Sequence, residues 1–397
     1  MDKPAFSGAK PGDLKKQAYI TVYRVLVNWL LLPVQRSAFL KKRTMKKIFL
    51  LFCCCYSLLP CTAQPESRSA DITVTVQEGI ELLSTIQYLG CQLANSTPSS
   101  YKQEIKTYFL PYRSHPAVTT IFMMSPTIYP DLTELGLLFY DFPAIKMRPM
   151  PDSSSWYKSI PRKELEEYLR FCMKFYRDSR FHTFYSAHQQ EYAGWGGQLK
   201  KSMEEPAGIF ARHFSGDAPL HWLVCLDPLN DWGAHTIVPR KLSAELKNHI
   251  VYQLGYFGDK TPEGGMRFKM NVYDFTWHES AHAISDGILA QYRTEIDSLS
   301  WMMKNDPALK KQNITDWAHY FDELIARSIS IALHKQYRSA TDHEKLLQFE
   351  TGRGFIYAAD VSDIIYDNLI HEQKISSFRE LLPLLFTTLK SRYKKEQ

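Results

Sequence analysis

Cysteine is scarce over most of this 397-residue sequence. Four of its seven cysteines, at positions 53, 54, 55 and 61, fall within the first 63 residues. The other three, Cys91, Cys172 and Cys225, can form one disulfide at most, which excludes a disulfide-stabilised scaffold. Their spacing also lacks the paired pattern of a cysteine zinc site. A chain of this length can instead bury a large core without cross-links.

A net positive charge is also missing from most of the chain, although the whole sequence carries a formal net charge of +6. Residues 1–63 hold 11 Lys and Arg against 2 Asp and Glu, so the other 334 residues hold 37 against 40. This balance gives no support for binding to nucleic acid or to an anionic membrane. Repeats, low-complexity tracts and heptads are absent too, which excludes solenoids and coiled coils.

No apolar run is long enough for a membrane span, since Arg24, Pro33 and Arg36 interrupt residues 18–40. Residues 45–63 have instead the pattern of a secretory signal peptide, with basic residues at 46–47, an apolar core at 48–59 and small residues at 61–63.

We therefore expect residues 1–44 to be a spurious upstream extension and the mature chain to begin near residue 64. The signal peptide places that mature chain outside the cell, in the periplasm or in the cell envelope. A lipid anchor at Cys61 is the alternative, although Pro60 fits a lipoprotein signal poorly.

Residues 64–215 are predicted to be a mainly helical region that opens with one strand at 72–76. Helical spacing of apolar residues indicates helices at 79–93, 98–110, 162–176 and 181–192. The aromatic residues at 181, 184, 185 and 192 are expected to pack in the core. His182 and His188 are expected on a solvated helix face, and His115 in a structural connection.

Residues 216–397 change character and are predicted to form a second region, with strands first and helices after them. Four short β-like segments, joined by turn residues, lie at 220–226, 235–238, 249–255 and 268–273. A Gly264-Gly265 turn has no phosphate-loop context. Together the two regions predict an α+β fold.

The strongest motif is His278-Glu279-Ser280-Ala281-His282, an H-E-x-x-H sequence in a helix-compatible run without proline. Residues four apart lie on one helix face, so both imidazoles can reach one metal ion. Zn²⁺ is the usual ion for such ligands. Glu279 stands beside them, where a general base would take a proton from water activated by the metal.

A catalytic zinc site needs a third protein ligand. A third histidine in the pattern H-E-x-x-H-x-x-G-x-x-H is excluded, since Ser285 and Ile288 stand at the required positions. The preferred candidate is Glu323, in a helix predicted to begin after an N-cap at Thr315, with Arg327 four residues on to hold its carboxylate. Glu295 and Asp297 remain competitors.

The motif followed by a helical glutamate resembles the gluzincin, or thermolysin-like, zinc metallopeptidases. That resemblance implies a zincin-like fold, with His278, His282 and Glu323 binding zinc and Glu279 polarising the water. The interval from His282 to Glu323, 41 positions, is longer than is usual in gluzincins. The chain also resembles an uncharacterised secreted bacterial family, domain of unknown function 4932, through residues 108–118, the pairs at 175–176 and 184–185, and the zinc motif.

These observations favour a secreted zinc peptidase acting on a peptide or protein substrate. His319 and Tyr357 are candidates for donating a hydrogen bond to the transition-state oxyanion. The edge strand that would pair with an extended peptide is either 234–238 or 252–256. The alternatives are a catalytically inactive zincin-fold binding module at the cell surface and a zinc hydrolase acting on a non-peptide bond, such as a cell-wall amide.

Overall fold

Four strands form the main sheet, in the order β1-β4-β6-β5. They are β1 (Asp71–Thr75), β4 (His221–Asp227), β6 (His249–Gly255) and β5 (Ala234–Ile237). β1, β4 and β6 run parallel, and β5 pairs with β6 in the antiparallel direction. A separate two-stranded sheet joins β2 (Phe139–Tyr140) and β3 (Lys146–Met147).

This computed structural model describes residues 70–92, 98–124, 132–150, 160–215, 219–231, 233–237, 246, 249–255 and 271–393. The predicted upstream extension, signal peptide and Gly264-Gly265 turn lie outside these residues. None of the described helices combines the length and the apolar character that crossing a bilayer requires.

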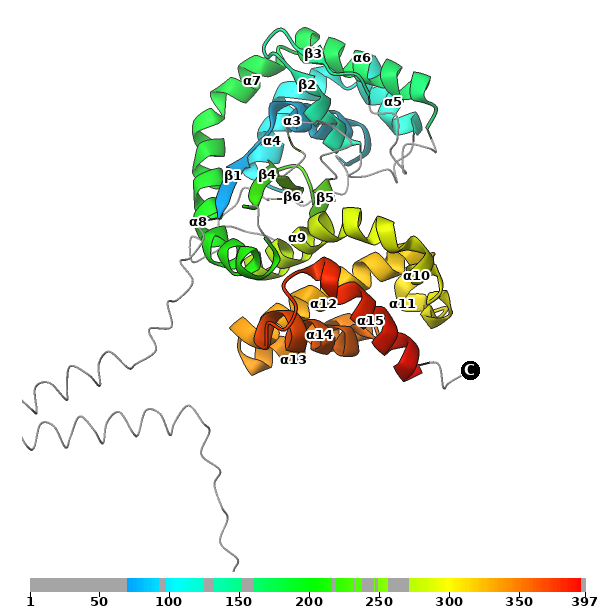
Figure 1. Cartoon of the computed structure of the whole chain (residues 1–397). Coiled ribbons are helices and arrows are strands. Elements are labelled where there is room, and N and C mark those ends of the chain that lie inside the picture. Colours follow the sequence, from blue (N-terminus) through cyan, green and yellow to red (C-terminus); the bar gives the residue numbers. More distant parts are fainter. Residues whose placement is uncertain are drawn as a thin grey trace, which may run out of the picture. The chain divides into compact units, whose positions relative to one another are not determined.

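Helices cover both faces of the main sheet (Figure 1). Side chains alternate along a strand, so Trp222 and Asp227 of β4 point to opposite faces. Trp222 donates from Nε1 to Ser280 of α9 (Val272–Leu289), whereas Asp227 accepts from Ser84 of α3 (Glu78–Gln87). Most of β4 and β6 is buried, as expected for parallel strands covered on both sides.

The helix predicted at 79–93 is present as α3 and the π-helical turn η1 (Tyr88–Gln92), but every residue of α3 is buried. Its other side is covered by the 3-10 helix η3 (Thr133–Leu138). The two backbones touch at Gly79 and Gly136, where an added Cβ would lie within 2.3 Å of the facing backbone. Glycine at these positions therefore permits the second layer over α3.

The helices predicted at 98–110 and 162–176 are confirmed, whereas the helix predicted at 181–192 is interrupted at His188 and divides into two. They are α4 (Ser100–Phe109), α6 (Arg162–Asp178), α7 (Phe181–Ala187) and the long α8 (Gln189–Phe214), and two elements not predicted, η2 (Leu110–Tyr112) and α5 (Pro116–Met124), lie between α4 and α6. Phe181, Phe184 and Tyr192 are buried, as expected for core aromatics.

The solvated face predicted for His182 and His188 is wrong for His188. Its ring packs between Phe184 and Tyr192, and its Nε2 lies 3.0 Å from Glu104. His182 is half-exposed and lies 2.8 Å from buried Glu78. His115 connects α4 with α5, where its Nδ1 accepts from the backbone N–H of Ala117.

The chain after the sheet is helical: α9 is followed by η7 (Ala290–Tyr292), α10 (Arg293–Asp297), η8 (Ser300–Met302), α11 (Pro307–Lys310), α12 (Trp317–Tyr337), α13 (Ala340–Gly352), α14 (Ala358–Ile365), η9 (Tyr366–His371) and α15 (Phe378–Tyr393). α12 packs along α9 on one side and α14 on the other.

Two local predictions in this part were wrong. The strand expected at 268–273 does not extend to its end, because Val272 and Tyr273 form the first turn of α9 and Asn271 caps that turn by accepting from the Tyr273 N–H. The N-cap of α12 is Asp316 instead of Thr315, and its carboxylate accepts from the His319 N–H.

The structure is α+β and mostly helical, as predicted. Residues 65–397 form a single compact unit. The predicted boundary near residue 215 separates two segments that share the main sheet, because β1 is hydrogen-bonded to β4 with Ile72 opposite Trp222.

A buried acidic network joins α3 to the carboxyl end of β4. Glu81 is fully buried, and its carboxylate accepts from Tyr101, which also contacts Tyr192. Asp227 accepts from Ser84 and from Gln253 of β6. Burial, and next the charge of Asp227, raise the pKa of Glu81 well above its usual range. Burial also raises the pKa of Asp227, against its hydrogen bonds.

The raised pKa of Glu81 predicts a pH-dependent stability. Between the unfolded and folded pKa values the folded state binds more protons, so the free energy of unfolding falls as pH rises through this window. Glu81→Gln removes one titrating group and should flatten this fall, measured by urea unfolding from pH 4.5 to 8. Glu344→Gln, at an exposed position of α13, is the control and should leave the slope unchanged. An equally steep slope in Glu81→Gln would contradict this account.

Candidate metal centre

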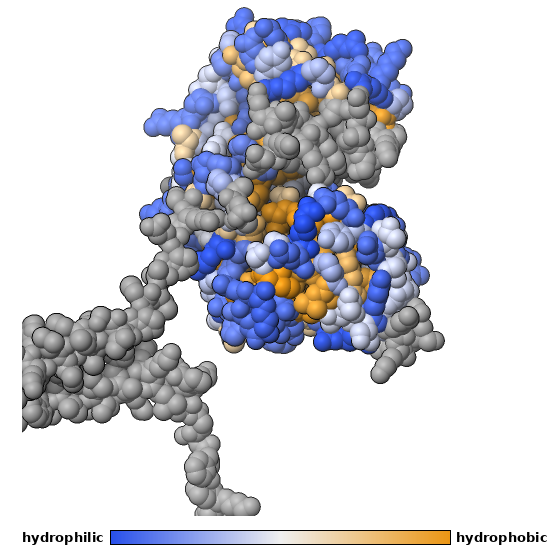
Figure 2. Space-filling model, viewed as in Figure 1, coloured by the Kyte–Doolittle hydropathy of each residue, from blue (hydrophilic) through white to orange (hydrophobic). Residues whose placement is uncertain are grey.

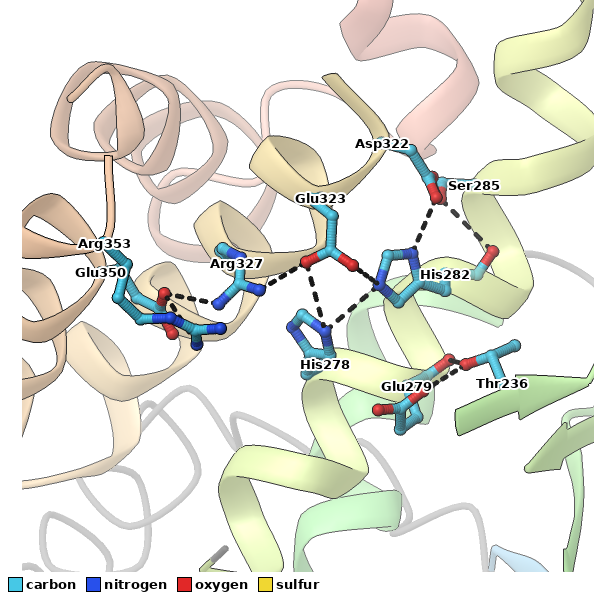
Figure 3. Close-up of polar contacts among 10 residues, drawn as sticks. All are labelled: Thr236, His278, Glu279, His282, Ser285, Asp322, Glu323, Arg327, Glu350 and Arg353. Carbon is cyan, nitrogen blue, oxygen red and sulfur yellow. Dashed lines mark hydrogen bonds and ion pairs between the residues drawn. The ribbon is translucent and has the colours of Figure 1, made fainter. Parts of the chain in front are cut away.

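Two histidines of α9 point to one place. His278 and His282 stand one helical turn apart, and their Nε2 atoms lie 3.2 Å from each other (Figure 3). The Asn271 cap and a proline-free stretch keep this part of α9 regular. The rings meet nearly edge to face, with an interplanar angle of 86°. Both lone pairs can therefore be directed at a single ion.

Glu323 of α12 completes the group. Its Oε1 lies 3.5 Å from His282 Nε2, and its Oε2 lies 3.9 Å from His278 Nε2. One ligand atom from each of the three residues lies within 4.8 Å of the others. A tetrahedral ion with ligand bonds of about 2.1 Å separates its ligand atoms by roughly 3.4 Å, so the observed spacing and the N, N, O donor set fit Zn²⁺.

A charged side chain holds Glu323 from behind. Arg327 Nη2 donates to Glu323 Oε2 at 2.6 Å, as the i to i+4 spacing predicted, and Nη1 donates to Glu350 of α13 at 2.5 Å. The Arg327 guanidinium also lies over the Phe355 ring, 4.2 Å from its centroid. Burial would raise the pKa of Glu323, but His282 and Arg327 outweigh it and hold that pKa well below its usual range.

Asp322 fixes the orientation of His282, and the sequence analysis missed it. Its Oδ2 lies 3.0 Å from His282 Nδ1, and its Oδ1 accepts from Ser285 one turn further along α9. Burial opposes protonation of His282, but Asp322 and Glu323 raise the pKa of that imidazole well above its usual range. When Nε2 loses its proton, an Nδ1–H donated to Asp322 leaves the Nε2 lone pair for an ion. In the sequence, the one indication of this role was that Asp322 is a second acidic residue directly before Glu323.

Burial and the neighbouring His282 have the opposite effect on the pKa of His278. They lower its pKa well below the usual range, which keeps this imidazole neutral, as a metal ligand must be.

Glu279 lies on the side of α9 that faces the sheet. Thr236 of β5 donates to its Oε2 at 2.6 Å, and the same hydroxyl lies 3.0 Å from the Glu279 carbonyl oxygen. The side chain is buried, and this burial raises the pKa of Glu279. A buried carboxyl group with a raised pKa, next in the chain to one of the two imidazoles, is a candidate general base. Thr236 was not predicted.

Among the described strands, β1 and β5 stand at the two ends of the sheet order, and β6 is an interior strand. Of the two predicted edges, the structure therefore supports the segment at 234–238, of which 234–237 is described, and excludes β6. Because β5 contacts α9, this edge of the sheet belongs to the same part of the molecule as Glu279.

The remaining candidates are not part of this group of three residues. Glu295 and Asp297 are exposed on α10, where Asp297 pairs with Arg293. His319 is exposed in the first turn of α12, and its backbone N–H binds Asp316. Tyr357 is buried, with its ring against Tyr393. Within the described part of the chain, the groups that could hold a metal ion reduce to His278, His282 and Glu323.

The family described as "Domain of unknown function (DUF4932)" matches residues 154–386, more than half of the chain. The chain belongs to this family. The H-E-x-x-H motif, Glu323 and the aromatic pairs at 175–176 and 184–185 lie within the match, whereas residues 108–118 precede it. Neither the curated proteins nor the solved structures include one that matches the chain.

The geometry predicts that Glu323, and not Glu295, is needed for metal binding. Glu323→Gln should reduce zinc affinity by more than about 100-fold, because it removes the only charged ligand. Competition with a chromophoric chelator measures this affinity. Glu295→Gln is the matched control and should bind zinc as the unchanged protein does. Equal losses in the two variants would contradict the assignment.

Asp322 should tune zinc affinity without being a ligand. Asp322→Asn keeps the shape but removes the charge that orients His282, and should weaken zinc binding by roughly 10- to 100-fold. The same chelator competition measures it, with Asp316→Asn, at the cap of α12, as the control for helix stability. Unchanged affinity in Asp322→Asn would show that the contact with His282 has no such role.

Proposed function

We propose that this member of the DUF4932 family is a zinc-dependent hydrolase that cleaves peptide bonds. The observation that carries the proposal is the convergence of His278, His282 and Glu323, with their ligand atoms within 4.8 Å, next to the buried carboxyl group of Glu279. Two imidazoles and one carboxylate, with an acid beside them, are the residue types that metal-assisted hydrolysis requires.

The three ligand residues would hold Zn²⁺, which supplies Lewis acidity that lowers the pKa of water and polarises a carbonyl group. Glu279 takes a proton from the attacking water and returns it to the leaving amine. Thr236 holds the Glu279 carboxylate in place. Asp322 and Arg327 orient His282 and Glu323, so the ligands need little rearrangement when the ion binds.

The sheet supports a peptide as the substrate. Among the described strands, β5 stands at an end of the sheet order and contacts α9, and an extended peptide can add to such an edge through backbone hydrogen bonds. A peptide bound there would lie on the side of α9 that carries Glu279. This placement, with the ligand set, is what a zincin-like fold of the gluzincin type would provide.

The long interval between the second histidine and Glu323 does not weaken this proposal. Residues 290–316 fold into the short elements η7, α10, η8 and α11, and α12 returns to pack along α9. The interval therefore lengthens the connection without moving Glu323 away from the histidines. We further propose that the mature protein acts outside the cell or in the cell envelope, after removal of residues 45–63.

The mechanism predicts that Glu279→Gln keeps zinc but loses hydrolysis by roughly 100-fold or more, because the amide cannot accept the proton. Bound zinc is measured by metal analysis, and turnover with a library of quenched fluorescent peptides. Thr236→Val is a second variant that should lower turnover less, since it removes only the hydrogen bond to Glu279.

Removal of zinc by a chelator should abolish turnover, and added zinc should restore it. A protein that binds zinc firmly but cleaves neither library peptides nor cell-wall amides would instead be the inactive zincin-fold binding module. Cleavage at the unchanged rate by Glu279→Gln would rule out the proposed mechanism.

A further inference from the structure

Glu78, His182 and Ser186 are joined in series by two polar contacts, and the proposed metal-dependent function uses none of them. Ser186 Oγ lies 3.2 Å from His182 Nε2, and His182 Nδ1 lies 2.8 Å from Glu78 Oε1. The series therefore runs from a hydroxyl through both imidazole nitrogens to a carboxylate. A hydroxyl within hydrogen-bond reach of a base, with that base oriented by a third group, is the arrangement that activates a serine nucleophile.

The helix α7 sets the spacing of the serine and the histidine. His182 and Ser186 are four residues apart, so they lie one above the other on the same face of the helix. Phe184 is buried, and the Tyr185 hydroxyl donates to the Val76 carbonyl oxygen at 2.7 Å, which fastens α7 to the chain before α3. Ser186 is exposed, and 41% of the His182 side chain is exposed as well. A molecule in solution can therefore reach the hydroxyl.

Glu78 is the buried end of the series. Its side chain is 8% exposed, and its Oε1 accepts a second hydrogen bond from the Tyr176 hydroxyl at 2.8 Å. Glu78 also stands in the first turn of α3, where the helix dipole favours a carboxylate. The carboxylate is thus held in place. In the neutral imidazole of His182, an Nδ1–H donated to Glu78 leaves the Nε2 lone pair for the serine proton.

This group belongs to a different part of the fold from the candidate metal centre. α7 packs against α3 and α6. α3 lies on the face of the main sheet opposite to α9, which carries the two histidines of the metal centre. Figure 1 shows α7 at the upper left of the molecule and α9 below the sheet. Chemistry at Ser186 would therefore not involve the proposed zinc ion.

We propose that Ser186 and His182, positioned by Glu78, form a second catalytic site that hydrolyses small activated esters. The Ser186 oxygen attacks the ester carbonyl carbon while its proton passes to His182 Nε2. The bond from that carbon to the alcohol oxygen then breaks, and the alcohol leaves with the same proton. Water next attacks the acyl-serine and gives a proton to His182, which returns it to Ser186 as the carboxylic acid is released.

The exposure of Ser186 determines which acyl compounds can react. The oxyanion of the tetrahedral intermediate would form in contact with water, whereas a preorganised oxyanion donor is worth about 10²–10³-fold in rate. Amides, whose amine leaves poorly, depend strongly on such a donor. Esters of acidic alcohols, such as p-nitrophenol, depend on it less. The substrate class is therefore esters with good leaving groups, and peptides are excluded from this site.

The test detects the covalent product on the serine. Full-length protein is incubated with p-nitrophenyl acetate, quenched with acid and digested, and its acetylated serines are identified by mass spectrometry. Ser202 is the internal control, because it is exposed on α8 and its hydroxyl donates to the Gln198 carbonyl oxygen instead of to a base. We expect Ser186 to be acetylated about 100-fold faster than Ser202, which is the lower range of general-base catalysis.

Two variants test the other members of the group. His182→Gln should lower the acetylation of Ser186 to the rate of Ser202, because an amide does not accept the proton. Glu78→Gln should lower it by about tenfold or more, because the carboxamide no longer selects one tautomer of His182. Glu164→Gln, at an exposed position of α6, is the matched control and should leave the rate unchanged.

Three results would overturn the proposal. They are acetylation of Ser186 no faster than that of Ser202, acetylation that survives His182→Gln, and hydrolysis of p-nitrophenyl acetate at the unchanged rate by Ser186→Ala. The first comparison needs no variant, so it decides the question even if a substitution unfolds the protein. Removal of zinc by a chelator should stop peptide cleavage and leave the acetylation of Ser186 unchanged. The failure of either proposal is therefore separate from that of the other.

Discussion

The candidate site depends on one constraint, which is the packing of α9 on two sides. Each side of the helix carries different residues of the site. Residues four apart share a helix face, so His278 and His282 both face α12, where Glu323 meets them. Glu279 is offset by about 100° around the helix and so faces β5. The packing of a single helix between a sheet edge and a second helix therefore sets the positions of the candidate ligand triad and of Glu279 at the same time.

Charges of alternating sign extend outward from this triad. The series Glu323, Arg327, Glu350 and Arg353 runs from α12 to the end of α13 (Figure 3). Each buried charge is stabilised by the next one, because an isolated buried charge would be neutralised or expelled. The series also keeps Glu323 ionised, as metal binding requires. Figure 2 shows apolar residues gathered in patches among polar ones over the part of the molecule that holds α12–α15 in Figure 1.

Local patterns predicted the elements and the three converging residues, but not the residues that surround them. The H-E-x-x-H spacing and the Glu323–Arg327 pair are relations within one helix, which helical periodicity defines. Asp322, Thr236 and Glu350 act across elements, so only the tertiary packing reveals them. The same limit explains one error: His188 was expected in solvent, but its partners Phe184, Tyr192 and Glu104 come from three helices, and Glu104 lies 84 positions earlier in the chain. The exposed position of His319 and the buried position of Tyr357 also depend on tertiary packing, which local sequence patterns do not define.

The pairing of β1 with β4 has a consequence for how this protein can be divided. The family match begins at residue 154, whereas β1 and α3 come before residue 93. A fragment cut at the start of the match would leave one side of β4 without a neighbour and Asp227 without Ser84. Such an open parallel edge favours self-association over folding. β1 and α3 thus complete the sheet and its covering layer in this chain, although both lie outside the family match.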